Sequence, residues 1–294
     1  MKIENETLNS KKGYLNEDFL LFHLKDQRNI EFEFHHHEFN KIIIFISGNV
    51  TYLIEGKAYK LKPWDILFVS SSEVHKPLID FSQPYERIVI WVNSRFLEQY
   101  NNNDCNLLTC FELAVKQKFN IVRLSSEFLI NIKHILSQLE DAGKSTDFGN
   151  VILKNSLFLQ LVIHLNRLYM RMENNKETSD IDYDENIGAI LDYINENISE
   201  ELSIDNLANR FYMSKYYLMH KFKKQTGYTI HNYILQKRLI MSNSLIKSGK
   251  LITEVYTECG FYDYSTFFRA FKKMFGVSPK KHYKAITEIE KSFR

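Results

Sequence analysis

A short motif occurs twice in the C-terminal part of this chain, and it constrains the fold more than any other feature. Residues 222–229 read FKKQTGYT and residues 271–278 read FKKMFGVS, so Phe-Lys-Lys-x-x-Gly recurs after 49 positions. A fixed internal period is typical of a duplicated structural unit. The sequence around each copy should therefore describe the same small piece of architecture.

The residues before each copy predict a helix, a tight turn and a second, capped helix. Ser214 and Asp263 lie eight positions before the repeated Phe, and both residue types are favoured as helix N-caps. Gly227 and Gly276 end the second helices. Before the caps the offset is 48 rather than 49, so the second turn should carry one extra residue. This pattern is the outline of a helix-turn-helix, whose second helix enters the major groove of DNA.

The spacing of apolar residues separates the expected core from the expected surface of each unit. Leu218 and Phe267 lie four positions before Phe222 and Phe271, so each pair should face inward over one helical turn. Residues 231–246 have a helical period and form a spacer between the units, long enough to place their second helices in successive major grooves about 34 Å apart. The alternative is an all-helical interaction module with solvated lysines.

Charge is distributed unevenly, although the formal net charge of the 294 residues is only +2. Residues 185–294 contain 17 Lys and Arg against 11 Asp and Glu, and the rest of the chain is net negative. Residues 206–253 contain nine Lys and Arg and no acid. A solvated surface normally mixes both signs, so a basic block within a helical region indicates a polyanionic partner, most simply nucleic acid.

The composition argues against several classes of protein. The chain has 44% hydrophobic and 25% charged residues, which is ordinary for a globular protein, and it is long enough for two domains. We find no signal-peptide pattern and no apolar run of membrane-spanning length. The three cysteines are scattered and odd in number, which fits a reducing compartment rather than a disulfide framework. A cytoplasmic protein is therefore expected.

The N-terminal part changes from a strand-like to a helical pattern. Residues 19–92 contain short alternating runs such as EFEF, KIIIFISG and ERIVIWV, which predict a small antiparallel barrel or sandwich. Residues 121–172 show helical spacing in two stripes. Residues 173–184 are polar and aperiodic, as in a linker. We expect an α+β chain with one domain over 1–172, a linker over 173–184 and an all-α domain over 185–294.

The C-terminal part of the chain resembles a known family. Residues 185–287 are similar to the DNA-binding domain of the AraC/XylS-type transcription regulators, which has two helix-turn-helix units. The late signature is VYTECGFYDYSTFFRAFKKMFGVSPKKHY, in which Gly260-Phe261, Gly276 and Ser278-Pro279 fit the family pattern. Arg238 and Leu245 in the spacer also fit. Tyr256 stands where alanine is usual, which should alter packing rather than class.

The resemblance implies base-reading residues on the exposed faces of two recognition helices. In the first helix they are Lys215, Tyr216, Met219 and His220, and in the second they are Tyr264, Ser265 and Arg269. Arg269 is the strongest candidate, because a guanidinium binds a guanine edge through two hydrogen bonds, worth about 1–3 kcal/mol of discrimination. The side chains expected to reach phosphates are Lys223, Lys224, Lys272 and Lys273.

A histidine-rich stretch, HHHEFNKIIIFISG at 35–48, lies among the N-terminal strands. It resembles the metal motif H-x-H-x3-E-x6-G of the cupin barrel that precedes the DNA-binding domain in many AraC-type proteins. His35, His37 and Gly48 match, but Lys41 takes the position of the carboxylate, and a protonated lysine does not bind metal. We therefore expect neither a metal nor a cofactor, although Glu38 is a substitute ligand that keeps the metal alternative open. Trp64 replaces the glycine of the usual Pro-x-Gly turn.

A sensor barrel should hold its ligand among polar and aromatic side chains near the strand ends. The candidate effector-binding residues are His35, His37, Lys41, Tyr52, Trp64, His75 and Trp91. A lysine beside histidines suits an anionic or hydroxyl-rich ligand, and tryptophan suits stacking on a sugar. The alternative is that these side chains only fill or border a small barrel.

These features indicate a sequence-specific DNA-binding regulator rather than an enzyme. The resemblance implies an activator more often than a repressor, controlled by a small metabolite, commonly a sugar. It also implies a homodimer formed through helices within 125–172, with promoter DNA and RNA polymerase as candidate partners. Two alternatives stay open. One is a regulator without an effector, controlled by abundance or a protein partner, and the other is a metal-dependent cupin enzyme fused to a DNA-binding domain.

Overall fold

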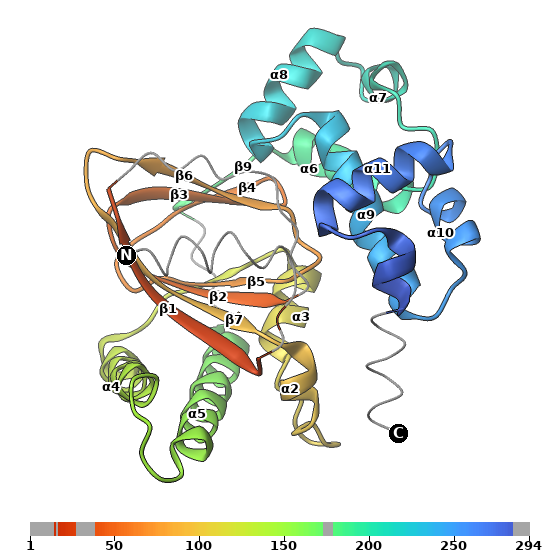
Figure 1. Cartoon of the computed structure of the whole chain (residues 1–294). Helices are drawn as coiled ribbons and strands as arrows, with labels where there is room; N and C mark the ends of the chain where they lie inside the picture. Colours follow the sequence, from red (N-terminus) through yellow and green to blue (C-terminus); the bar gives the residue numbers. More distant parts are fainter. Residues whose placement is uncertain (1–14, 16, 28–38, 173–178, 285–294) are drawn as a thin grey trace.

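The structure is a computed structural model that describes residues 15, 17–27, 39–172 and 179–284 (Figure 1). Its N-terminal half contains two antiparallel sheets that lie face to face, and its C-terminal half is helical. This arrangement confirms the α+β class predicted from the sequence. The two sheets are not joined into a closed cylinder by hydrogen bonds among the described strands, so the cupin-like unit is a sandwich.

Sheet A has five strands, and its order places strands distant in sequence side by side. In spatial order the strands are β1 (Phe19–Asp26), β7 (Tyr85–Val92), β2 (Asn40–Ser47), β5 (Ile66–Val69) and β8 (Ile121–Val122). Sheet B has four, in the order β6 (His75–Asp80), β3 (Asn49–Ile54), β4 (Lys57–Lys60) and β9 (Ile181–Tyr183). The strand β9 lies within the predicted linker and pairs with β4.

The alternation of side chains along β2 divides the domain into two apolar layers. Ile42 and Ile44 point to the outer face of sheet A and join a large cluster with the helices, whereas Ile43 and Phe45 point inward toward sheet B. Lys41 shares the inward register of Ile43 and is therefore carried into the space between the sheets. The period-two pattern of the sequence thus determines which face receives each residue.

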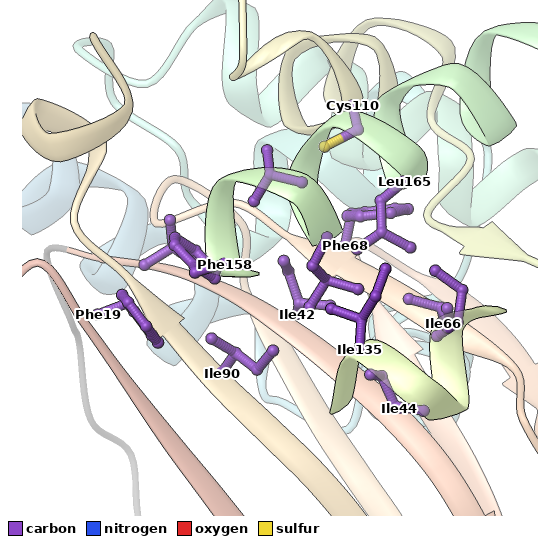
Figure 2. Close-up of a cluster of buried hydrophobic side chains, with 14 of the residues drawn as sticks. Phe19, Ile42, Ile44, Ile66, Phe68, Ile90, Cys110, Ile135, Phe158 and Leu165 are labelled. Carbon is purple, nitrogen blue, oxygen red and sulfur yellow. The ribbon is translucent and has the colours of Figure 1, made fainter. Parts of the chain in front are cut away.

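Helices cover the outer face of sheet A. The two longer ones lie within residues 121–172, as the helical spacing predicts, whereas residues 121–122 form β8 and two shorter helices precede that range. The helices are α2 (Ser94–Glu98), α3 (Thr109–Gln117), α4 (Ser126–Ala142) and α5 (Asn150–Arg171). Figure 2 shows their side chains against the sheet, with Phe158 and Leu165 of α5 and Ile135 of α4 facing Ile42 and Ile90. Burial of such side chains stabilises the fold by about 1.5–3 kcal/mol each.

Residues 279–284 are helical, and six further helices form most of the described C-terminal half. They are α6 (Glu185–Glu196), α7 (Ile204–Arg210), α8 (Lys215–Thr226), α9 (Ile230–Lys247), α10 (Ile252–Glu258) and α11 (Tyr264–Phe275). Two separate apolar clusters hold them, one around α6, α7 and α8 and the other around α10 and α11. The long helix α9 contributes to both clusters, so it connects the two units rigidly. Nowhere in the described ranges is a helix both long and apolar enough to cross a membrane.

Candidate nucleic-acid interface and effector site

Both predicted helix-turn-helix units form, and their caps are those that the repeat predicts. Ser214 accepts a hydrogen bond from the backbone N–H of Tyr217 at 3.3 Å, and Asp263 accepts one from Thr266 at 2.8 Å. Each second helix, α8 or α11, ends at a left-handed glycine with φ of +79° or +76°. The N–H of that glycine donates to the carbonyl of the repeated lysine four residues earlier, at 2.9 Å in both units. The two units therefore share their local structure as well as their sequence pattern.

The tight turn of each unit contains one residue with a left-handed backbone, and these two residues lie 48 positions apart, which is the offset seen before the caps. Tyr212 and Gly260 both have a left-handed backbone, with φ of +52° and +76°. Tyr212 is fully solvent-exposed, but a Cβ on Gly260 would lie 2.8 Å from the carbonyl oxygen of Ser199. The second turn therefore requires glycine for close packing, whereas the first turn accommodates a tyrosine at the cost of some backbone strain.

The first recognition helix, α8, presents its predicted contact residues to solvent. Lys215, Tyr216, Met219 and His220 are all exposed, and the rings of Tyr216 and His220 stack at 6.3 Å. Leu218 and Phe222 on the opposite side are fully buried, as predicted. Lys223 and Lys224 are exposed in the last turn. One face of the helix is thus exposed to solvent, where Lys215 pairs with the exposed Asp205, while the other face anchors the helix.

The second recognition helix, α11, has the same arrangement. Ser265 and Arg269 are exposed, and the Nε of Arg269 donates to the carbonyl of Ser265 at 3.3 Å. Tyr264 is 40% exposed because its ring packs against Tyr256 and Phe267, with ring centres 5.8 and 6.0 Å apart. Tyr256 thus fills space beside the recognition helix, in agreement with the expected effect on packing. The exposed lysines of its last turn are Lys272 and Lys273.

The spacer helix is held to both units by polar contacts, of which the one to the second unit is buried. Arg238 of α9 donates through Nε to the carbonyl of Ile198 at 3.0 Å and through Nη2 to that of Glu200 at 2.6 Å. Further along the helix, Asn243 bonds the Nε2 of the buried His282 at 2.6 Å. These contacts fix α9 against the segments before and after it, so the relative position of the two recognition helices is set by the fold.

Each half of the chain matches the model of a known protein family. An "AraC-like ligand binding domain" matches residues 20–162, and a "Helix-turn-helix domain" matches residues 207–285. Together the two matches cover about three quarters of the sequence. The chain is an AraC-type transcription regulator.

Curated relatives of this AraC-type chain match it along most of its length. The HTH-type transcriptional activator RhaR of Mannheimia succiniciproducens is 24% identical over 259 residues, covering 85% of this chain and 87% of that protein. The activator RhaS of Citrobacter koseri is 25% identical and covers 84% and 85%. Among solved structures, the C-terminal domain of the response regulator AraT from Geobacillus stearothermophilus is 25% identical, with a TM-score of 0.34 over 35% of this chain and 86% of that domain.

In the AraC-like ligand binding domain, the predicted effector residues occupy different places. Lys41, Tyr52 and His75 meet between the sheets: Lys41 Nζ lies 3.4 Å from His75 Nε2, and the rings of Tyr52 and His75 stack at 6.2 Å. Trp91 is the cross-strand neighbour of Lys41, and its ring packs against Phe39 at 4.5 Å. These side chains form a continuous polar and aromatic group, which we call the intersheet group.

Trp64 does not belong to the intersheet group. It packs against the large outer cluster of sheet A and lies under the Nζ of Lys133, 4.2 Å from its ring centre. Its backbone has φ of +71°, the left-handed conformation that glycine adopts most easily, so the turn keeps its shape after the replacement. His35, His37 and Glu38 lie outside the described residues, and the structure therefore does not place the metal-type motif.

Contacts between the two domains are the part of the site that the sequence did not predict. Glu55, in the turn between β3 and β4, accepts hydrogen bonds from Lys237 Nζ at 3.1 Å and from the hydroxyl of Tyr233. The hydroxyl of Tyr228 donates to the carbonyl of His75 at 2.7 Å. The partners of Glu55 lie 178 and 182 residues away, so no local signal identifies them.

An open pocket lies beside these contacts and is lined by both domains. Among its lining residues, Glu73 accepts a hydrogen bond from Asn120 at 2.8 Å, and burial raises the pKa of the Glu73 carboxyl to about 7. Leu191 and Lys237 of the C-terminal half also line the pocket, as does Val115, which is 40% exposed. We call this space the boundary pocket. It lies where the two domains meet.

Proposed function

We propose that this protein is a transcriptional activator that binds promoter DNA through both helix-turn-helix units and responds to a small metabolite, most simply a sugar, in its N-terminal domain. The observation that carries the proposal is the pair of recognition helices with matching caps and exposed polar faces, joined by one rigid spacer. The named relatives are activators, which supports the same sign of regulation.

The roles of individual residues follow from their exposure and chemistry. Arg269 reads a guanine edge in the major groove, and Lys273, at the end of the same helix, neutralises a phosphate. In the first unit, the exposed ring of Tyr216 contacts a sugar or a thymine methyl, and Lys215 and His220 flank it. The spacing of the helices sets the spacing of the DNA half-sites.

The regulation rests on the contact between the domains. Metabolite binding beside His75 favours one arrangement of sheet B, and the backbone of His75 holds Tyr228 directly after the first recognition helix. The two arrangements of the chain differ in their affinity for DNA, so binding of the metabolite and binding of DNA are thermodynamically linked. The polar segment 173–184 connects the domains, one over 1–172 and the other over 185–294.

The active form is a homodimer through the helices of 125–172. At the tip of the α4–α5 hairpin, apolar side chains face solvent, among them Phe148, Val151 and Ile152, each more than 70% exposed. A second copy of the same face would cover them. Two linked DNA-binding domains raise the apparent affinity through effective concentration. The dimer works in the cytoplasm, where RNA polymerase is its partner at the promoter.

Selection from a pool of random DNA duplexes tests the proposal. The purified full chain should enrich a sequence with two conserved patches whose centres lie about 10–10.5 base pairs apart. The variant Arg269→Ala should lose conservation at one position of one patch, and exposed Lys60→Met on β4 serves as the control. A pool without any enriched sequence after repeated rounds would contradict the proposal.

A further inference from the structure

We infer that the effector carries a carboxylate group and that the ammonium of Lys41 binds it. The inference rests on the proposed function and deepens it, because it names the chemical class of the metabolite. A sugar acid, rather than a neutral sugar, is the ligand that the intersheet group fits.

Lys41 is a buried cation without an anionic partner among the described residues. Its side chain lies between the sheets and the residue is only 8% exposed, yet no described carboxylate lies within 4 Å of its Nζ. A lysine has three N–H donors. One of them is directed at His75 Nε2 at 3.4 Å, and the ring of Phe39 lies 5.9 Å away. Because burying an unpaired charge is costly, such a position is expected where a ligand supplies the counter-charge.

Arg87, which lies opposite Phe45 on the adjacent strand, is a second buried cation and provides a comparison. Arg87 is 6% exposed on β7, with an inward register like that of Lys41. Its guanidinium pairs with Asp26 at 2.5 Å and stacks on the ring of Tyr85 at 4.3 Å. The chain therefore provides an acid for one buried cation and none, among the described residues, for the other.

The surroundings of Lys41 are arranged to receive the carboxylate and the body of a small molecule. The Nδ1–H of His75 donates to the carbonyl of Glu73 at 2.9 Å, which leaves its Nε2 as the acceptor facing Lys41. The ring is thereby fixed as an orienting group for the ammonium. Tyr52 stacks on His75, and Trp91 lies opposite on the next strand, so hydroxyl and aromatic groups flank the cation. A ring with hydroxyls and one carboxylate matches this set.

Thermal unfolding of the full chain with matched ligand pairs tests the inference. The probes are D-glucuronate against D-glucose, D-galacturonate against D-galactose, and D-gluconate against D-sorbitol, as sodium salts with equal sodium chloride added to the neutral probes. We expect at least one acid to raise the unfolding midpoint by several degrees more than its neutral partner. The preference should vanish in Lys41→Met and persist in the exposed-lysine control Lys60→Met.

The outcomes separate the inference from the proposed function. Protection by neutral sugars alone, silence of all three acids, or an acid preference that survives Lys41→Met would each overturn the inference. An acid response that is lost when Val115→Trp obstructs the boundary pocket, but kept in Lys41→Met, would also overturn it and place the ligand between the domains. A further outcome is an acid that raises the unfolding midpoint only when Lys41 is present and yet leaves the affinity for the selected DNA unchanged. That result would support the inference and contradict metabolite control.

Discussion

Glu55 of the N-terminal domain and Lys237 of the spacer helix form an ion pair of 3.1 Å across the domain boundary. Both side chains are about four-fifths buried, and the same carboxylate accepts hydrogen bonds from the hydroxyl of Tyr233 and from the N–H of Val74. Glu55 has a left-handed backbone with φ of +43°, a strained conformation for a residue with a side chain. The turn is thus shaped to bring one carboxylate onto the helix that connects the two DNA-binding units.

The Glu55–Lys237 pair should couple the stabilities of the two domains. In a double-mutant cycle with Glu55→Gln and Lys237→Met, we expect a coupling energy of about 1–3 kcal/mol in chemical denaturation. Lys118 and Asp192 also pair across the boundary, but both are about half exposed, so their cycle should give at most about 1 kcal/mol. Equal coupling energies in the two cycles would show that burial of the Glu55 pair has no special effect.

Arg269 and Lys273 should affect DNA binding in different ways. Arg269→Ala should weaken binding to the selected sequence by about 1–3 kcal/mol and leave binding to random DNA almost unchanged. Lys273→Ala should weaken both and reduce the dependence of affinity on salt by about one phosphate contact. Fluorescence anisotropy over a salt series measures both quantities. If the two variants behave alike, the assignment of base and phosphate contacts is wrong.

Lys41→Met should stabilise the protein near neutral pH. Burial lowers the pKa of Lys41 from its usual 10.5 to about 7, so between pH 7 and 10.5 the unfolded chain binds more protons at this position than the folded chain. The cost of the lysine is therefore fully present below pH 7 and disappears as the pH approaches 10.5, with an upper limit of about 5 kcal/mol. Among the described residues, His75 contacts Lys41 and Tyr52 stacks on His75, and both titratable groups are retained in the variant.

Urea denaturation of Lys41→Met and the parent chain at pH 7 and pH 10 measures this effect. The difference in unfolding free energy should favour the variant at pH 7 and shrink at pH 10. A difference that is constant with pH, or that grows toward pH 10, would show that the lysine is not a buried cation with a lowered pKa.

Two glycines with the same backbone conformation should respond differently to alanine. Gly260 and Gly276 both have φ of +76°, so each substitution carries a similar backbone cost of about 1 kcal/mol. A Cβ on Gly260 would also lie within 3 Å of the carbonyls of Ile198 and Ser199, whereas nothing lies within 4 Å at Gly276. Gly260→Ala should therefore be the more destabilising by about 1–3 kcal/mol in thermal or urea unfolding. Equal losses would mean that the close approach in the second turn relaxes freely.

The apolar tip of the α4–α5 hairpin should be a dimer contact. Replacing exposed Val151 and Ile152 by Asp places charges where the proposed interface is apolar, so sedimentation should show a shift from dimer to monomer. Folding should be retained because both side chains are more than 70% exposed in the single chain. Exposed Lys60→Glu, on β4 and outside 125–172, is a charge-changing control that should leave the dimer intact. A parent chain that sediments as a monomer, or variants that remain dimeric, would contradict this interface.

Local sequence signals predicted the C-terminal domain in detail and the N-terminal site only in part. The caps at Ser214 and Asp263, the glycine stops and the buried pair Leu218–Phe222 depend on neighbours within one or two helical turns, so periodicity and propensity suffice to find them. The alternation in β2 likewise predicts a strand, but it does not say which residues of sheet B meet Lys41. That pairing depends on how two sheets stack.

Contacts that depend on long-range packing could therefore not be predicted from the sequence. Trp64 was predicted to join the effector residues because it lies in a turn near them, but its backbone directs it to the outer cluster. Glu55 carries no motif, and its role becomes visible only when Tyr233 and Lys237 are brought against it. A single buried residue with a distant partner has no periodicity to reveal it.

The most direct test of the account is hydroxyl-radical footprinting of the full chain on the selected duplex. Two recognition helices fixed on one spacer should protect two short patches on one face of the DNA, with centres about 10–10.5 base pairs apart, for each bound chain. Arg269→Ala should weaken protection of the patch read by α11 and retain the other. A single protected patch per chain, or two patches on opposite faces of the duplex, would contradict the central claim that both helix-turn-helix units read DNA together.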